Sequence, residues 1–381
     1  MKTVGIICEY NPFHLGHKKQ IDRIRQEWGD DCAIVCLMSG NFVQRGDCAV
    51  FDKSFRAKAA IQCGADLVLE LPVTYALSSA EGFAAGGIRI LSGFCDILCF
   101  GTESGSAHTL MATAEALLSP AFSPALRREL ESGSSFPAAR QAALASLGMD
   151  DSLLKSPNDI LAVEYCKAIL SQGSQMKMMP ILRQGGYHDT NADPKNPSAT
   201  AVRKLLLSEG NWRDFLPEAA AQVFENAPLH AKAAAERAIL AKLRTMTDAE
   251  FEALPYGSEG LWRKLMHASR ESGTLEQILI QTKSKRYTRT RLERMVMCAF
   301  LGITREVMDT PAPYARVLAF NETGAAILKK ARSFGLFPHI GDETRQAYEA
   351  LETHCERLYG LFRLDGPASP DTKRRVYIKK T

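Results

Sequence analysis

The fold is decided by the stretch Cys8-Glu9-Tyr10-Asn11-Pro12-Phe13-His14-Leu15-Gly16-His17, in which an apolar strand over residues 4–8 runs through a turn into a helix carrying H-x-G-H. His14 and His17 are three residues apart, so on a helix that begins near Phe13 they project from one face of its first turn. Unpaired backbone N–H groups and the helix dipole favour phosphate there. Gly16 has no side chain and would let an adenine ring or ribose approach the backbone. The spacing therefore predicts a nucleotide site.

A simpler interpretation also fits two histidines at a helix start, namely a helix cap plus a surface residue. The position in the chain favours the nucleotide site, because the motif follows the first predicted strand and opens the first helix. In open parallel sheets, ligands bind beyond the carboxyl ends of the strands.

Short apolar runs alternate with helical stretches through the first half of the chain. Strands are expected at residues 4–8, 33–38, 66–71, 96–100 and 178–183, and helices at 18–28, 54–63, 79–91, 107–118, 124–147, 157–170 and 199–207. This alternation predicts an α/β fold, a Rossmann-like parallel sheet with right-handed crossovers.

Beyond residue 211 strands become scarce, and amphipathic helices are expected at 231–243, 261–269, 275–281 and 290–300. We therefore expect two domains. Residues 1–210 would form a Rossmann-like nucleotide-binding domain with a helical insertion at about 106–172, and residues 211–381 a mainly α-helical domain.

Composition narrows the class of protein. The 381 residues are 46% hydrophobic, which is enough for a sizeable core, and no apolar run approaches the length of a membrane span. Without a recognisable signal peptide, the expected place is the cytoplasm, with no membrane partner. The ten cysteines form no C-x-x-C pair and are expected to be core residues. The net charge of +4 is too small by itself to indicate a nucleic-acid binder.

Polar residues follow several predicted strands. In the loop over residues 39–46, Arg45 could meet a phosphate, although an ordinary loop with one solvated arginine fits as well. Gly101 would allow a base or ribose close to the backbone. Arg183 ends the last strand of this half. It could contact a phosphate there, and a solvated arginine at a strand end fits as well.

The string Ser156-Pro157-Asn158-Asp159 has the pattern of a helix start. Ser156 would be the N-cap, Pro157 the first helical residue, and Asp159 the partner of Ser156 in a pair resembling a capping box. The amide of Asn158 lies one step inside the helix, where it could bind a base or a ribose hydroxyl.

A second motif, Ser198-Ala199-Thr200-Ala201-Val202-Arg203, places two hydroxyls and a guanidinium at a helix start. Thr200 and Arg203 share a face, so this group could hold phosphate oxygens while Arg203 neutralises departing pyrophosphate. Simple N-capping by Ser198 is the alternative.

H-x-G-H together with S-x-T-x-x-R resembles the HIGH-type nucleotidyltransferase superfamily. Five longer strings are similar to the bacterial tRNA(Met) cytidine acetate ligase family: GIICEYNPFH (5–14), MSGNFVQRG (38–46), GADLVLELP (64–72), KSPNDIL (155–161) and KRYTRTRL (285–292). The resemblance covers most of the chain. It implies an enzyme that makes acetyl-adenylate from acetate and ATP and then acetylates the wobble cytidine of elongator tRNA(Met) to N4-acetylcytidine.

The resemblance also implies site residues. The further nucleotide contacts fall on Gly101, Asn158 and Arg183, and the superfamily motif adds Ser198 and Thr200. The ATP-binding segment falls on Ile7, Cys8, Glu9, Tyr10, Asn11, Pro12, Phe13, His14, Leu15, Gly16, His17, Lys18, Lys19 and Gln20.

The chemistry so implied needs charge stabilisation on the phosphates and no covalent enzyme nucleophile. We expect His14 and His17 to stabilise the α-phosphate during attack and Arg203, with Lys53 or Arg56, to assist pyrophosphate departure. Mg²⁺ is expected as a partner of ATP, held largely by the nucleotide, because no carboxylate cluster indicates a protein metal site.

A basic stretch in the second domain is the candidate tRNA interface, because basic charge with an aromatic ring suits backbone contact plus base stacking. Glu293 is its only acidic neighbour in the sequence, and a solvated basic helix face is the alternative. The basic tail Lys373-Arg374-Arg375 is either a second phosphate contact or a disordered end. The stretch contains Tyr287 and Thr288 among the basic residues Lys283, Lys285, Arg286, Arg289, Arg291 and Arg294.

Three other functions stay open at this point. A class I aminoacyl-tRNA synthetase fits least, because S-x-T-x-x-R takes the place of the lysine-rich second signature and no separate amino-acid domain is evident. A small-molecule adenylyltransferase would use the same two motifs without needing the basic stretch. A non-catalytic ATP- and RNA-binding protein would need the basic stretch without the histidines. The oligomeric state is not indicated by any feature of the chain.

Overall fold

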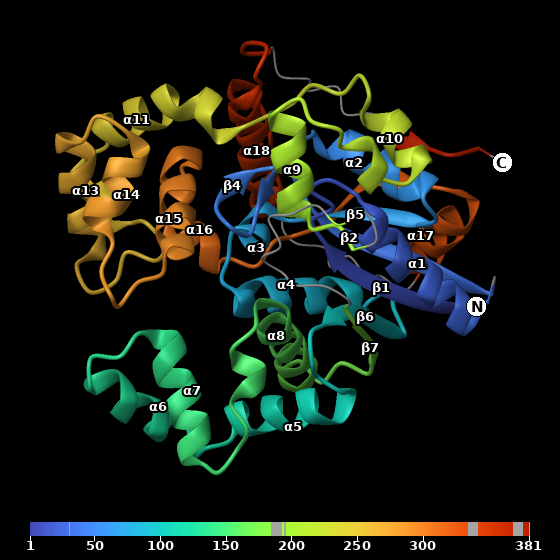
Figure 1. Cartoon of the computed structure of the whole chain (residues 1–381), viewed down its shortest axis with the longest axis horizontal. Coiled ribbons are helices and arrows are strands. Elements are labelled where there is room, and N and C mark those ends of the chain that lie inside the picture. Colours follow the sequence, from blue (N-terminus) through green and yellow to red (C-terminus); the bar gives the residue numbers. More distant parts are fainter. Residues whose placement is uncertain (30, 184–192, 194–195, 334–341, 369–375, 381) are drawn as a thin grey trace.

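A seven-stranded sheet forms the centre of the computed structural model, which describes all residues except 30, 184–192, 194–195, 334–341, 369–375 and 381 (Figure 1). The strand order is β7-β6-β1-β2-β5-β8-β9, and β5 and β8 pair antiparallel while all other neighbours are parallel. The strands are β1 (Lys2–Cys8), β2 (Cys32–Ser39), β5 (Leu67–Leu71), β6 (Ile97–Thr102), β7 (Lys177–Leu182), β8 (Arg316–Phe320) and β9 (Tyr377–Ile378).

The central strands are buried on both faces, as a parallel sheet covered by helices requires. Every residue of β2 is buried, and neighbouring positions face opposite ways: Val35 and Leu37 join one apolar cluster, Ile34 and Cys36 the other. All ten cysteines are buried and none forms a disulfide, which confirms that they are core residues.

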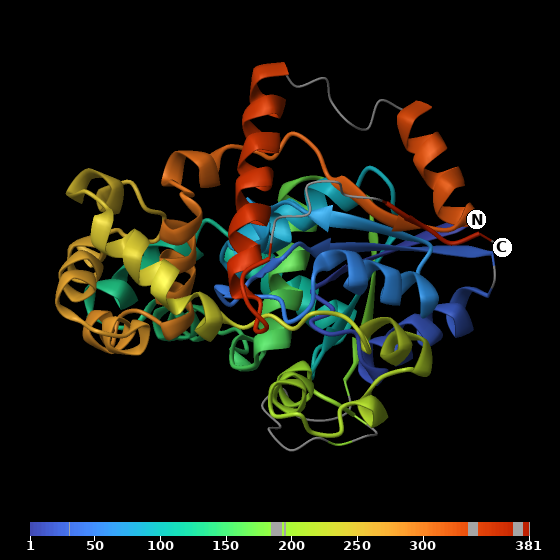
Figure 2. The same cartoon turned by 90° about the horizontal axis from the view of Figure 1, so that it is seen from above.

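Helices cover the two faces of the sheet. One face carries α4 (Ala80–Leu91), α5 (Ala107–Leu118), α8 (Pro157–Ser171) and α17 (Glu322–Ser333), and the other carries α1 (Leu15–Trp28), α2 (Lys53–Gln62), α9 (Ala199–Leu207) and α10 (Glu218–Phe224). In Figure 2, the orange α17 stands above the sheet and the yellow-green α9 and α10 lie below it. The predicted Rossmann-like α/β fold is confirmed.

The helices between β6 and β7 differ from the prediction in one respect. The single helix expected over 124–147 is two helices, α6 (Phe122–Glu131) and α7 (Phe136–Ser146). Gly133 separates them at a φ of 86°, a backbone conformation in which glycine is favoured.

A group of helices with its own apolar cluster stands beside the sheet (Figure 1). It consists of α11 (Glu236–Thr245), α12 (Asp248–Glu252), α13 (Leu261–Glu271), α14 (Leu275–Thr282), α15 (Arg289–Leu301), α16 (Arg305–Asp309) and α18 (Asp342–Tyr359). Shorter elements are α3 (Val73–Ala76) and the 3₁₀ turns Ser152–Leu154, Arg213–Phe215, Lys232–Ala235 and Gly360–Phe362.

Two strands from the part expected to be a separate helical domain complete the sheet. β8 pairs with β5 and β9 pairs with β8, while α17 packs on the same sheet. Runs of five and two residues carry too little periodicity to predict a strand. The division of the chain at residue 210 stays a prediction, but the sheet itself extends across it.

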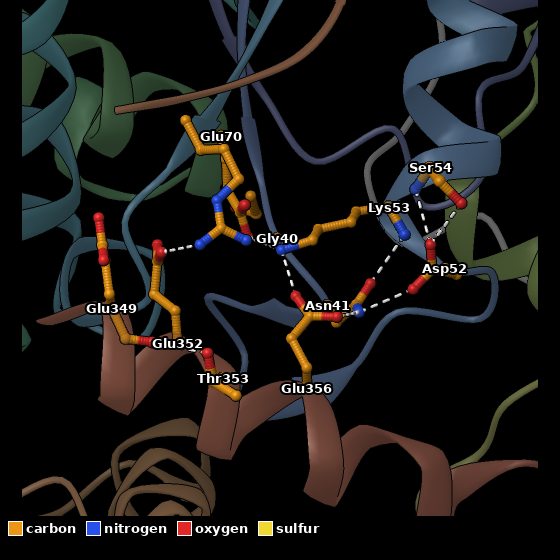
Figure 3. A network of polar contacts seen from close by, with 12 residues as sticks. Gly40, Asn41, Asp52, Lys53, Ser54, Glu70, Glu349, Glu352, Thr353 and Glu356 are labelled. Carbon is orange, nitrogen blue, oxygen red and sulfur yellow. Dashed lines mark hydrogen bonds and ion pairs between the residues drawn. The ribbon is translucent and has the colours of Figure 1, made fainter. Parts of the chain in front are cut away.

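A buried polar network ties α18 to the sheet (Figure 3). Lys53 of α2 pairs with Glu70 of β5 at 2.5 Å and with Glu356 of α18, and Glu352 of α18 pairs with Arg316 of β8 at 2.5 Å. Burial, with the nearby charge of Glu70, raises the pKa of Glu352 to about 7. Three carboxylates and two cations therefore join four elements in the interior.

A hairpin after β2 connects the sheet with the helical group. Its strands are β3 (Phe42–Val43) and β4 (Asp47–Cys48), and the turn between them contains Gly46 at a φ of 73°. A Cβ atom at Gly46 would lie 2.4 Å from the backbone nitrogen of Arg294 in α15. The turn thus packs directly on the backbone of that helix.

This close approach gives a prediction for stability. Gly148 has a φ of 74° with open space around a Cβ, so Gly148→Ala should lower the free energy of unfolding by about 1 kcal/mol through backbone strain alone. Gly46→Ala should lower it by about 2 kcal/mol more, because backbone atoms of α15 must move as well. Urea unfolding of both variants measures the difference, and equal losses would show that the hairpin does not press on α15.

Candidate active site

A cavity of about 680 Å³ opens where the carboxyl ends of β1, β6 and β7 meet. The strand order reverses between β1 and β6, and ligands of open α/β sheets bind at such a switch point. This volume suits a ligand of nucleotide size. The lining includes these predicted residues: Ile7, Cys8, Glu9, Tyr10, Asn11, His14, Gly16, His17, Lys19, Gln20, Gly101, Asn158, Arg183, Ser198, Thr200 and Arg203.

Four residues of the predicted ATP-binding segment are absent from the lining: Pro12, Phe13, Leu15 and Lys18. Phe13 is fully buried and packs edge-on against Tyr10, with ring centroids 4.8 Å apart. Lys18 pairs with Asp22 one turn along α1. The structure gives these side chains packing contacts and an ion pair instead.

His14 and His17 form a reciprocal cap at the start of α1. His14 is the N-cap residue, one position beyond the predicted helix start, and its Nδ1 accepts a hydrogen bond from the Gly16 N–H at 3.1 Å. Nδ1 of His17 accepts from the His14 N–H at 3.2 Å, and the two rings stack at 3.7 Å. Because both Nδ1 atoms are acceptors, the ring protons lie on Nε2. Each imidazole is thus an N–H donor on the cavity wall.

Electrostatics keep both rings neutral. Burial lowers the pKa of His14 to about 3, and the charges of Arg183 and Arg203 add to this effect. Burial, the neighbouring His14 and Arg183 lower the pKa of His17 well below its ordinary value. At neutral pH the histidines therefore donate hydrogen bonds while the arginines supply the positive charge.

Two glycines make room for side chains rather than for a ligand alone. A Cβ atom on Gly16 would lie 2.9 Å from Cε1 of His14, so the missing side chain leaves room for this imidazole. A Cβ on Gly101 would lie 3.1 Å from Cδ of Arg183. The lack of a side chain at both glycines thus leaves room for His14 and Arg183, which line the cavity.

The second motif forms the predicted N-cap, and its hydroxyls and Arg203 line the cavity, while their contact with phosphate stays a prediction. Ser198 caps α9, because its Oγ accepts a hydrogen bond from the Ala201 N–H at 3.1 Å. Arg203 donates to the carbonyl of Asn11 at 2.7 Å and to the hydroxyl of Thr200 at 3.2 Å. Arg203 therefore ties the start of α9 to the loop before α1 while lining the cavity.

Asn158 and Arg183 form part of a chain of hydrogen bonds. The Asn158 amide donates to Glu103 at 2.6 Å, and its oxygen accepts from Arg183 at 3.2 Å. This arrangement orients the Arg183 guanidinium along the cavity wall.

The capping pair predicted for Ser156 and Asp159 is wrong. Ser156 is the N-cap of α8 by position but makes no side-chain cap hydrogen bond. Asp159 instead accepts from the Glu103 N–H at 2.7 Å and the Ser104 hydroxyl at 2.6 Å. A carboxylate in the first turn of a helix can serve a neighbouring loop as well as its own helix, and here the loop after β6 takes it.

Lys53 and Arg56 do not line the cavity, so the expectation that either assists pyrophosphate departure is wrong. Lys53 is engaged in the network with Glu70 and Glu356 (Figure 3). Arg56 is fully buried, and its guanidinium donates to the backbone carbonyl of Glu9 at 2.6 Å. Both cations hold the scaffold.

The far wall of the cavity was missed by sequence reasoning. Phe83, Phe100, Leu161 and Tyr165 line it. Tyr165 lies seven residues, or two helical turns, after Asn158 and therefore on the same face of α8. That spacing was the signal available in the sequence.

The basic stretch lies in the loop between α14 and α15 and at the start of α15. Arg289 is paired with Glu276 at 2.5 Å and with Glu293 at 3.0 Å. Arg286 lies 3.0 Å from Glu259, which also accepts from the hydroxyl of Tyr287 at 2.8 Å. The expectation that only Glu293 opposes this stretch is therefore wrong, because Glu259 and Glu276 come from segments distant in sequence.

The remaining basic residues divide into two kinds. Arg291 donates to the carbonyl of Tyr256 at 2.8 Å and lies over the Tyr287 ring, so it supports the loop from within. Lys283 and Lys285 are exposed and make no ion pair with any residue that the structure describes. These two lysines are therefore the charges of the stretch that remain available to a nucleic-acid phosphate. The tail residues Lys373, Arg374 and Arg375 lie outside the described residues.

Two absences apply to the described part of the chain. None of its helices is long and apolar enough to cross a membrane. Within the same ranges, no three side chains among His, Cys, Asp and Glu are grouped so that they could hold a metal ion.

Comparisons with known proteins agree with the geometry. Residues 1–368 match the family described as HIGH Nucleotidyl Transferase. The tRNA(Met) cytidine acetate ligase of Clostridium novyi (strain NT) is 35% identical, with both chains fully covered, and that of Alkaliphilus metalliredigens (strain QYMF) is 36% identical over 89% of this chain and 87% of its own. The crystal structure of Thermotoga maritima TmcAL (apo, form I) is similar over 100% of both chains, with a TM-score of 0.91 and 28% identity. The form bound with alpha-thio ATP has a TM-score of 0.89, with the same identity and coverage.

The lowered pKa of His14 gives a prediction for stability against pH. Between about pH 6.5 and 3 the unfolded chain binds a proton at His14 that the folded chain does not, so folding stability falls as pH falls through this window. His14→Asn retains a capping oxygen but cannot titrate. The stability of wild type relative to this variant should therefore fall by about 1.4 kcal/mol per pH unit between pH 6 and 4.

Denaturant unfolding at several pH values measures this difference. His108→Asn, at an exposed position of α5, controls for loss of an imidazole elsewhere. A gap between wild type and His14→Asn that does not change with pH would contradict the assignment of a neutral, buried His14.

Proposed function

The chain belongs to the HIGH nucleotidyl transferase family and, within it, to the tRNA(Met) cytidine acetate ligases, and on this premise we propose that it activates acetate with ATP and acetylates the wobble cytidine of elongator tRNA(Met). The observation that carries the proposal is one cavity in which the H-x-G-H histidines face Arg183 and Arg203. The full-length similarity to ligases favours this function over a small-molecule adenylyltransferase and over a non-catalytic ATP- and RNA-binding protein.

The first step forms acetyl-adenylate. An acetate oxygen attacks the α-phosphorus of ATP, and the bond to the leaving pyrophosphate breaks. The Nε2–H groups of His14 and His17 donate to the phosphate oxygens as charge builds up on them, and Arg203 offsets the charge of the pyrophosphate. Binding of alpha-thio ATP by the Thermotoga maritima relative supports ATP as the nucleotide.

Mg²⁺ would accompany ATP, but the residues of the cavity do not fit a protein-held ion. The carboxylates in its lining are Glu9, Asp22 and Asp47, and no metal-binding group of three forms among the described residues. We therefore assign the ion to the phosphates of the nucleotide and derive no step through it.

The second step needs tRNA beside the cavity. Arg45 lines the cavity, and the adjoining Gly46 packs on α15 beside Arg294. The start of α15 is five residues before Arg294, about 7.5 Å along the helix axis. The basic loop thus adjoins the cavity, which supports tRNA as the acyl acceptor. A tRNA substrate is in turn our reason for proposing the cytoplasm as the place of action.

The activation step is tested by pyrophosphate release from purified protein with ATP and acetate, followed by mass analysis of the nucleosides of added tRNA(Met). We expect acetate-dependent release and one added acetyl group on cytidine. His14→Asn should slow release on the order of a hundredfold, because it keeps a capping oxygen while its shorter side chain places no N–H donor at the position of the imidazole Nε2. Pyrophosphate release that does not depend on acetate but requires a phosphorylated metabolite would instead place the protein among the small-molecule adenylyltransferases.

The basic loop is tested by tRNA binding. The double substitution Lys283→Ala and Lys285→Ala should weaken tRNA binding roughly tenfold near 0.1 M salt and make log K less dependent on log salt by about 1 to 2, since each lysine neutralises roughly one phosphate. Pyrophosphate release without tRNA should stay at the wild-type rate, because the loop is not part of the cavity lining.

The matched control removes Lys329 and Lys330 from α17, on the side of the molecule away from α14 and α15 (Figures 1 and 2). It makes the same change in net charge. Equal weakening by both double substitutions would mean that net charge, and not this loop, determines binding.

A further inference from the structure

We propose that Glu9 is the catalytic residue that accepts the proton lost by the cytidine amine during acetyl transfer. This inference rests on the proposed function and deepens its second step. It assigns a role to a side chain that the activation of acetate does not use.

Glu9 is held at the cavity from two sides. It lies in the loop between β1 and α1 and is one of the residues that line the cavity. Its Oε1 accepts a hydrogen bond from the Gln44 N–H of the hairpin at 2.9 Å, and its backbone carbonyl accepts from Arg56 at 2.6 Å. The carboxylate is therefore fixed between the loop that leads to His14 and the hairpin that adjoins the tRNA loop.

The other polar groups near the phosphates are unable to take the proton. Nδ1 of both His14 and His17 is occupied by a backbone N–H, and the lowered pKa values make these rings weak bases. Arg183 and Arg203 are cations and have no acceptor atom. Burial raises the pKa of Tyr165, with the charges of Cys8 and Glu9 contributing, so this hydroxyl keeps its proton. Ionised carboxylates are acceptors only, so the carboxylates of the lining are the next candidates.

Three carboxylates line the cavity, and two of them are already engaged with cations. Asp22 pairs with Lys18. Asp47 accepts from the Cys48 N–H at 2.8 Å and lies 3.8 Å from Lys232. Glu9 makes no ion pair with any residue in the described ranges, so among the three lining carboxylates it is the one not paired with a lysine there.

Acetyl transfer conserves atoms and electrons with Glu9 as the base. The lone pair of the cytidine N4 forms a bond to the acetyl carbon, and the bond from that carbon to the phosphate oxygen breaks. The electron pair of the broken bond leaves with AMP. The nitrogen loses one proton to the Glu9 carboxylate, which returns it to water. An exocyclic amine conjugated with its ring is a weak nucleophile, so removal of this proton as the bond forms assists the attack.

Glu9→Gln separates the two steps, because the amide oxygen can still accept from the Gln44 N–H while its basicity is lost. Acetyl-adenylate is measured by trapping with hydroxylamine, a strong nucleophile that needs no enzyme base. Transfer is measured as single-turnover acetylation of tRNA(Met). We expect transfer to fall about a hundredfold more than hydroxamate formation, with a residual rate that rises with pH. Glu115→Gln, the same chemical change at an exposed position of α5 outside the cavity lining, should leave the ratio of the two rates as in wild type.

Other results would overturn the inference. Transfer by Glu9→Gln at the wild-type rate would mean that the leaving phosphate takes the proton. A parallel loss of hydroxamate and transfer would make Glu9 a residue that only shapes the cavity. If the wild-type protein forms no hydroxamate from acetate and ATP, the ligase function itself fails, and the role of Glu9 fails with it.

Discussion

A buried guanidinium is the constraint on which the active site depends. Arg56 is fully buried and makes no ion pair with any residue in the described part of the chain. Its charge is stabilised by backbone carbonyls of Glu9, Ser39, Gly40 and Phe51. An unpaired charge in the interior is tolerated only when hydrogen bonds satisfy it, so the loops after β1 and β2 must bring their carbonyls to this point. The position of Glu9, and the start of the hairpin, follow from that requirement.

The cap of α1 satisfies backbone N–H groups and also determines which ring nitrogen of each histidine carries the proton. The first backbone N–H groups of α1 lack partners within the helix, and Nδ1 of His14 and of His17 satisfies two of them. The same hydrogen bonds fix the tautomer, because a ring nitrogen that accepts forces the proton onto the other one. A serine cap would satisfy the backbone equally well but would present no N–H group to the cavity. The imidazoles combine both tasks in one side chain.

Local patterns predicted the sheet and the cavity, because strand alternation and strand-end motifs are properties of neighbouring residues. The same patterns failed wherever the partner was distant. Lys53 and Arg56 resemble phosphate ligands by position, yet Glu70 and Glu356 hold one and backbone carbonyls hold the other. Glu276 neutralises Arg289 from another helix. Charge compensation across the fold leaves no trace in the local sequence, and neither does a strand as short as β9.

β8 is translated long after β5, the strand with which it pairs, and this delay has a consequence during synthesis of the protein. β5 ends at Leu71, and the strand that covers its free edge begins at Arg316. At roughly 5–20 residues per second, a ribosome needs tens of seconds to make the intervening chain. Throughout that interval the apolar edge of β5 can pair with other nascent chains. A nascent polypeptide that already contains the whole nucleotide motif is therefore still immature, and the cell must shield it until the last part of the sheet has left the ribosome.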